Sequence, residues 1–157
     1  MAASKKDPLT LEDPSKDEDW DQYRYVQITS LVNEVGQAVR KYNKQLTAAV
    51  FPKPSLAKMI CRQDWANWNL DAVMPMICHN FCNKEDSCIE EVVREDVKEL
   101  PLDVGLYAGV FLSELSPDEL VEALHYAHKG GQGCCLFYRT YAWLGPLEEM
   151  ERCPEKL

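Results

Sequence analysis

Two cysteines and two histidines have the spacing of a candidate metal site. Cys78 and Cys82 are four residues apart and His125 and His128 are three apart, so on helices each pair shares one face. Thiolates and imidazoles in a set of four are ligands that zinc prefers in proteins. The sequence therefore offers, as an alternative function, a small zinc-binding or redox-linked helical protein whose two helices pack face to face. Zinc fingers usually use a tighter cysteine spacing and cysteine is common in cores, so we favour a protein without a cofactor.

Groups that could carry catalysis lack the partners that catalysis needs. A nucleophilic cysteine requires an oriented base, and the available pairing of Cys134 or Cys135 with one of the two histidines has nothing to orient it. Acidic pairs such as Glu95-Asp96 are typical of solvated helix faces. The glycine-rich stretch 129–133 lacks the ending of a phosphate-binding loop and coincides with a predicted helix end. We therefore expect a protein that is not an enzyme.

The cysteine count and the N-terminus predict a protein of the cell interior. Seven cysteines are an odd number, and residues 1–7 contain lysines without an apolar run behind them, unlike a secretory signal. We expect buried, reduced thiols in the cytoplasm or in a mitochondrion. The alternative is a disulfide staple that starts from the Cys78/Cys82 pair, as in proteins of the mitochondrial intermembrane space. No apolar run approaches the roughly 18 residues of a transmembrane helix.

Charge is distributed unevenly along the chain. The net charge of −9 argues against direct binding of nucleic acid. Residues 23–63 carry a net charge of +6, whereas residues 85–122 carry −10. Such asymmetry is typical of two solvated faces, and it can also steer a protein partner of complementary charge.

The longest pattern in the chain is an apolar seam between residues 20 and 50. Its spacing alternates between three and four residues, which places its members on one side of a helix. The members are Tyr25, Ile28, Val32, Val35, Val39, Tyr42, Leu46 and Ala49. A seven-residue repeat kept this long is a signal of the coiled-coil type. The pattern predicts one helix of roughly 45 Å, longer than the core of this domain needs, so we expect part of it to contact a partner.

The remaining chain predicts further helices with short links. Ser55 is expected to cap a second helix that reaches about residue 68. Residues 70–82 and 87–100 are expected to form a third and a fourth, the latter with Ile89, Val92, Val93 and Val97 facing inward. Ser116-Pro117-Asp118-Glu119 has every feature of a helix start, and Gly130-Gly131 ends that helix. The remaining helices are expected at residues 104–112, 134–144 and 147–153; for the first two a buried strand is the alternative, because short apolar runs fit both.

Together these patterns predict an all-α fold, an irregular bundle of about seven helices organised on the long N-terminal helix. We expect an extended or disordered acidic arm at residues 1–19, one helical domain at 20–153 and a tail at 154–157. The predicted function is a non-catalytic interaction protein, a subunit or accessory factor in a hetero-oligomeric assembly with protein partners. The residues predicted to bind the partner are Trp20, Tyr23, Tyr25, Arg40, Lys41 and Lys44.

Overall fold

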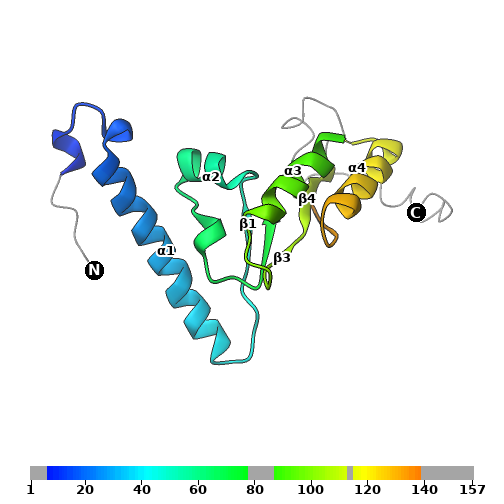
Figure 1. The fold of residues 1–157 in the computed structure, drawn as a ribbon, viewed down its shortest axis with the longest axis horizontal. Coiled ribbons are helices and arrows are strands. Elements are labelled where there is room, and N and C mark those ends of the chain that lie inside the picture. The colour runs from blue at the N-terminus through cyan, green and yellow to red at the C-terminus, as the bar shows by residue number, and fades with distance from the viewer. Residues whose placement is uncertain (1–6, 78–86, 113–114, 139–157) are drawn as a thin grey trace.

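Helices and parallel strands alternate along most of the chain. The computed structural model describes residues 7–77, 87–112 and 115–138, and Figure 1 shows its fold. Two 3-10 turns, η1 (Pro8–Thr10) and η2 (Pro14–Lys16), precede the long helix α1 (Glu18–Arg40). The other helices are α2 (Pro54–Cys61), α3 (Ser87–Lys98) and α4 (Pro117–Gly130), with a 3-10 turn, η3 (Trp65–Asn67), after α2. The strands are β1 (Thr47–Val50), β2 (Ala72–Pro75), β3 (Gly105–Leu106), β4 (Ala108–Phe111) and β5 (Cys134–Phe137).

The strands lie side by side in the order in which they occur in the sequence. β1 pairs with β2 and β2 with β3, while β4 pairs with β5, all in parallel. Tyr107 alone separates β3 from β4, and a parallel bridge between Met76 and Gly109 links β2 to β4. The described strands therefore form one nearly continuous row, with β1 and β5 outermost.

The predicted all-α bundle is wrong, because this protein is a mixed α/β protein. Residues 72–75, within the predicted third helix, form β2, and residues 105–111, within the predicted buried helix, form β3 and β4. Residues 134–137 are strand β5, whereas the predicted helix at 147–153 lies outside the described residues. Each of these segments is a short apolar run whose backbone bonds to a neighbouring strand, and the sequence alone does not show that neighbour.

The long N-terminal helix is shorter than its apolar seam predicts. Asp17 caps α1 by accepting the N–H of Trp20, and the helix ends at Arg40 after 23 residues. Asn43, with a φ of 53°, adopts the left-handed conformation, and the chain then turns into β1. Tyr42, Leu46 and Ala49 therefore continue the sequence pattern without belonging to the helix. Pairing of residues 47–50 with β2 replaces the last turns of the predicted helix.

The predictions for α3 and α4 are confirmed, whereas the predicted start of α2 is wrong. Ser116 forms a full capping box with Glu119 at the start of α4, as predicted. Helix α3 also falls within its predicted range. The predicted cap Ser55 is wrong, because α2 begins at Pro54 after Lys53, whose side chain makes no capping bond.

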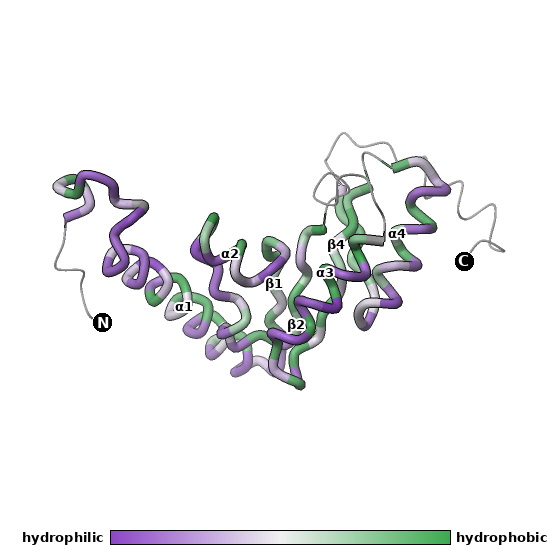
Figure 2. Tube along the Cα trace, turned by 45° about the horizontal axis from the view of Figure 1, so that its top comes forward, coloured by the Kyte–Doolittle hydropathy of each residue, from purple (hydrophilic) through white to green (hydrophobic). Residues whose placement is uncertain are grey.

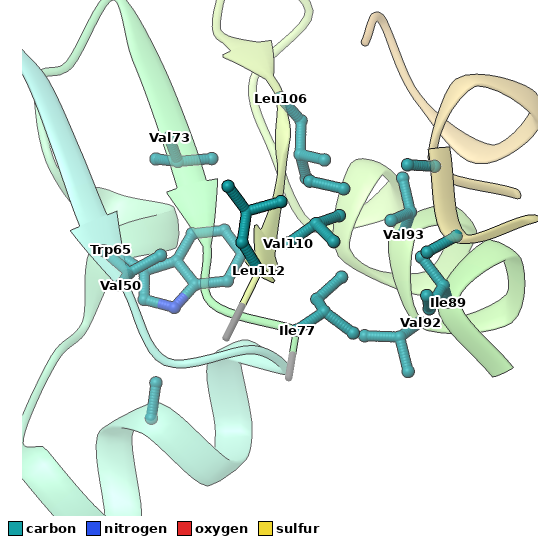
Figure 3. Packing of buried hydrophobic residues seen from close by; sticks show 14 of the residues in the cluster. Val50, Trp65, Val73, Ile77, Ile89, Val92, Val93, Leu106, Val110 and Leu112 are labelled. Atoms are coloured by element: carbon teal, nitrogen blue, oxygen red, sulfur yellow. The ribbon is translucent and has the colours of Figure 1, made fainter. Parts of the chain in front are cut away.

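The core lies between one face of the strand row and the helices. Every other strand residue faces it, including Val73, Leu106 and Val110. Figure 3 shows Leu106 and Val110 pointing toward Val93 of α3, whereas Val73 lies on the side of Val50 and Trp65. Helix α4 contributes Leu120, Ala123 and Ala127 to the same cluster, and α2 contributes Ala57. Burial of this apolar surface is the main force that holds the helices on the sheet.

Candidate interaction surface

Helix α1 is fastened to the rest of the protein mainly by polar contacts. Of its residues only Gly36 is buried, although Ile28 and Val32 pack against the edge of the core. The helix lies beyond α2 on the β1 side of the sheet (Figure 1). The polar contacts are Asp21 with Arg62 at 3.0 Å, Thr29 Oγ1 with the Trp68 indole N–H at 3.1 Å, Asn33 Oδ1 with the Asn69 N–H at 3.1 Å, and Arg40 with the Asn69 carbonyl at 3.1 Å. A helix held in this way keeps much of its surface exposed.

The exposed side of α1 carries apolar residues. Leu31 and Val35 are 62% and 42% exposed, and their four-residue spacing places them on the same side of the helix. Figure 2 shows hydrophobic residues recurring along α1 among hydrophilic ones. Val35 belongs to the apolar seam of the sequence, so the described part of the chain covers this seam incompletely. We call Leu31 and Val35, with the basic end at Lys41 and Lys44, the α1 surface.

The aromatic residues predicted to bind a partner make contacts within the chain. The rings of Trp20 and Tyr23 stack at 5.5 Å between centroids, and the Arg24 guanidinium lies over Trp20. The Lys58 ammonium lies 4.9 Å from the centre of the Tyr25 ring and so joins α2 to α1. All three aromatic side chains are half-buried. Tyr25 therefore helps to position α1, whereas Trp20 and Tyr23 form a local aromatic pair at its beginning.

The predicted basic residues divide into one anchor and two exposed lysines. Arg40 donates to the Asn69 carbonyl and approaches Asp71 at 3.5 Å. Asp71 in turn accepts the N–H of Leu46 at 2.7 Å, so this carboxylate ties the end of α1 to the entry of β1. Lys41 and Lys44 lie in the exposed loop between these elements. Of the predicted basic set, these two lysines are the exposed ones.

The described part of the predicted metal site consists of two exposed histidines. His125 and His128 both lie on α4 with exposed side chains, and the ring of His125 packs edge-on against Tyr126. Cys78 and Cys82 lie outside the described residues. Among residues 7–77, 87–112 and 115–138, no group of three or more His, Cys, Asp or Glu side chains could hold a metal ion. Zinc binding therefore stays a prediction, which zinc analysis of untagged protein and a free-thiol count would test.

The described cysteines differ from the expected buried thiols. Cys88 is disulfide-bonded, whereas Cys61, Cys134 and Cys135 are free. Cys134 is exposed and the other two free cysteines are half-buried. Partial desolvation of the thiol, followed by the neighbouring thiol of Cys135, raises the pKa of Cys134. A raised pKa lowers the thiolate fraction at neutral pH, so these features do not favour a nucleophilic Cys134.

A buried carboxyl that the sequence pattern missed lies beside β1. Asp96 was expected on a solvated face, yet its side chain is 0% exposed, whereas Val97, expected to face inward, is 42% exposed. Asp96 follows Ile89, Val92 and Val93 at spacings of seven, four and three residues, which is the periodicity of the buried side of α3. That periodicity could have identified the position, although an acidic residue there is unusual.

Asp96 joins α3 to the beginning of α2. Its Oδ1 accepts the backbone N–H of Lys53 at 3.0 Å, and Oδ2 has no hydrogen-bond partner among the described residues. Desolvation by burial raises the pKa of Asp96 to about 7, although the Lys53 hydrogen bond opposes this shift. The Lys53 ammonium itself pairs with Glu95 at 3.0 Å. These residues line an open cleft of about 350 Å³ together with Pro54, Ser55, Lys98 and Glu99.

Comparisons with known proteins give no direct indication of function. No protein-family model, curated protein or solved structure was found to match this chain. Among the described residues, no helix is both long and apolar enough to cross a membrane. A functional assignment therefore depends on the surfaces described above.

Proposed function

We propose that this chain is a non-catalytic interaction protein, a subunit or accessory factor of a multiprotein assembly inside the cell. The observation that carries the proposal is the exposure of helix α1. Only Gly36 of this helix is buried, and the apolar side chains of Leu31 and Val35 are exposed. Exposed apolar residues on one side of a helix are characteristic of helix docking, in which residues four apart insert into a partner groove.

The charge around the α1 surface favours an acidic partner. Lys41 and Lys44 are exposed at the end of the helix, within the segment 23–63 whose sequence charge is +6. Other basic residues of that segment are paired with acids, for example Lys53 with Glu95 and Arg62 with Asp21. Complementary charge mainly increases the association rate, while burial of apolar side chains supplies most of the affinity. The disulfide at Cys88 favours an oxidising compartment, such as the mitochondrial intermembrane space, over the reducing cytosol.

Site-specific photo-crosslinking in cells tests this proposal. A photoreactive amino acid replaces Leu31 in one variant and Glu122, an exposed residue of α4, in the control variant. Adducts of defined mass are expected from position 31 and not from position 122. When Lys41→Glu and Lys44→Glu are combined with the photoreactive residue at position 31, the yield of the adduct should fall several-fold if charge steers the partner. Equal adducts from both positions, or none from position 31, would contradict the assignment of the α1 surface.

A second candidate function follows from the strand topology. Parallel strands joined by helices commonly bind ligands beyond their carboxyl ends. There the rings of Phe111 and Phe137 lie 5.1 Å apart, and Tyr138 is exposed next to them. This arrangement fits a planar apolar ligand. Titration with indole, monitored by NMR, should shift the resonances of these rings. The Phe137→Ala variant should not bind indole. Unshifted resonances in the wild type would rule out this candidate function.

A further inference from the structure

Among the described residues, strand β1 has no paired strand on the side away from β2. The Val50 carbonyl accepts the Met76 N–H, and because N–H and C=O directions alternate, Leu46, Ala48 and Val50 face β2. Thr47 and Ala49 therefore direct their backbone groups away from β2, and both residues are exposed. The Phe51 N–H is bonded to the Gln63 side chain at 2.9 Å, so the open edge ends there.

Strand β5 presents the complementary edge. The Gly133 carbonyl accepts the Ala108 N–H, so Gly133, Cys135 and Phe137 direct their backbone groups towards β4. Cys134 and Leu136 direct theirs away from it. No residue of β5 is buried. Both outer strands of the described row are thus four residues long and parallel, and each lacks a neighbour on its outer side within that row.

The face of the strand row opposite the core is also incompletely covered. The strand residues that alternate with the core residues form this open face: Thr47, Ala49, Ala72, Met74, Gly105, Gly109, Phe111, Cys135 and Phe137. Its middle is buried at Ala72 and Gly109, whereas Thr47 and Ala49 are exposed and the three residues nearest β5 are half-buried. None of them belongs to the buried core cluster, and none is charged. An uncharged face between two unpaired edges favours further association, because natural proteins usually protect such edges with charge or proline.

We propose that a second copy of this chain pairs its β1 with β5, and its β5 with β1, so that the strands close into a two-fold symmetric parallel barrel. Because Tyr107 alone separates β3 from β4, these two count as one strand of the row, and two copies supply eight strands. This inference specifies the partner within the proposed interaction function and therefore depends on it. A second copy is the occupant because each outer strand lacks a parallel neighbour among the described residues, and the outer strand at the opposite end of the same row has the length and direction of that neighbour. Eight is also the strand number at which parallel barrels close around a packed interior.

Backbone alternation fixes the register of the junction. If Leu136 lies opposite Ala48 of the second copy, its N–H and C=O meet the C=O of Thr47 and the N–H of Ala49. The same register places Leu136 and Ala48 on the helix-covered side, as their contacts with the core cluster require. On the open face it places Phe137 beside the small side chain of Ala49. The junction thus repeats the pattern of the pairings within one chain.

Sedimentation of the full-length chain tests the second copy. The expected species has twice the 18.0 kDa mass of one chain. Ala49→Lys adds a charge at the β1 edge and should shift the protein to a monomer, with the dissociation constant raised at least tenfold. The matched control Ala38→Lys, on the exposed side of α1, should remain a dimer. Circular dichroism must show that both variants keep their secondary structure.

A cysteine pair tests the register even if the lysine variant fails to fold. Thr47→Cys lies opposite the native Cys135 in the proposed junction, at a separation that a disulfide spans. Oxidised glutathione should then give a covalent dimer, and Thr47→Cys combined with Cys135→Ser should not. A mass of one chain at every concentration, or a dimer that only Ala38→Lys dissociates, would overturn the inference. In either case an adduct from position 31 would still support the α1 surface.

Discussion

Asp96 shows how one buried residue can make stability depend on pH. Its pKa is raised to about 7 from a value of 3.8 for the free side chain, chiefly because burial disfavours the charged form. Between these two pH values the folded chain keeps a proton that the unfolded chain has released. The free energy of unfolding therefore falls as pH rises from about 4 to about 7 and changes little above that range.

We predict that Asp96→Asn removes this dependence. Asparagine retains an oxygen that can accept the Lys53 N–H and carries no charge to bury. The wild type should lose up to about 4 kcal/mol between pH 4 and pH 7, and the variant should lose much less. Urea unfolding at several pH values measures the difference, with Glu91→Gln on the exposed side of α3 as the control. Parallel pH profiles for the wild type and Asp96→Asn would refute the role of this carboxyl.

At the scale of elements, helix α4 has the strongest local start signal, whereas α2 has a proline at its first position and no side-chain cap. Ser116 accepts the Glu119 N–H and the Glu119 side chain accepts the Ser116 N–H. We predict that Ser116→Ala lowers the free energy of unfolding by about 1 kcal/mol, because it removes an N-cap. Ser55→Ala should change it by less than about 0.5 kcal/mol, because Ser55 is exposed inside α2. Thermal unfolding of both variants measures the contrast, and equal losses would contradict the capping assignment.

The junction between β2 and β4 depends on a glycine. A Cβ atom at Gly109 would lie 2.8 Å from the Pro75 carbonyl oxygen and 3.2 Å from the Met76 Cα. We predict that Gly109→Ala lowers the free energy of unfolding by about 2 kcal/mol, because backbone atoms have to move apart.

The control for this prediction is the buried glycine of α1. A Cβ at Gly36 would meet the flexible end of Arg40 at 2.8 Å, and alanine is the better helix former by about 1 kcal/mol. Gly36→Ala should therefore change stability by less than about 1 kcal/mol in chemical unfolding experiments. If Gly36→Ala destabilised the protein more than Gly109→Ala, the close approach of β2 and β4 would not be a tight constraint.

At the scale of the whole molecule, pairing with a second copy makes stability depend on concentration. If dimers are the folded form, a hundredfold increase in protein concentration adds about 1.4 kcal/mol per chain. We predict that the melting temperature then rises by roughly 3 °C. Scanning calorimetry of the wild type and Ala49→Lys measures this effect, which should be absent in the variant. A melting temperature independent of concentration in the wild type would argue against the dimer.

The sequence by itself determined the features that depend on local chemistry. The Ser116 capping box and the apolar periodicity of α3 set those two helices, because the relevant groups lie within one or two turns of each other. The sequence also predicted that the apolar seam of the first helix would exceed what its own core needs, and Val35, a member of that seam, is 42% exposed. These patterns need no distant partner to be recognised.

Only the tertiary structure decided where strands form. The runs around Val73, Val110 and Leu136 are short and apolar, so their own residues fit a buried helix or a strand equally well. Pairing across more than twenty residues of sequence selects the strand, since each backbone group needs a hydrogen-bond partner in another segment. The same pairing ends α1 at Arg40 and leaves β1 and β5 as the outer strands of the described row.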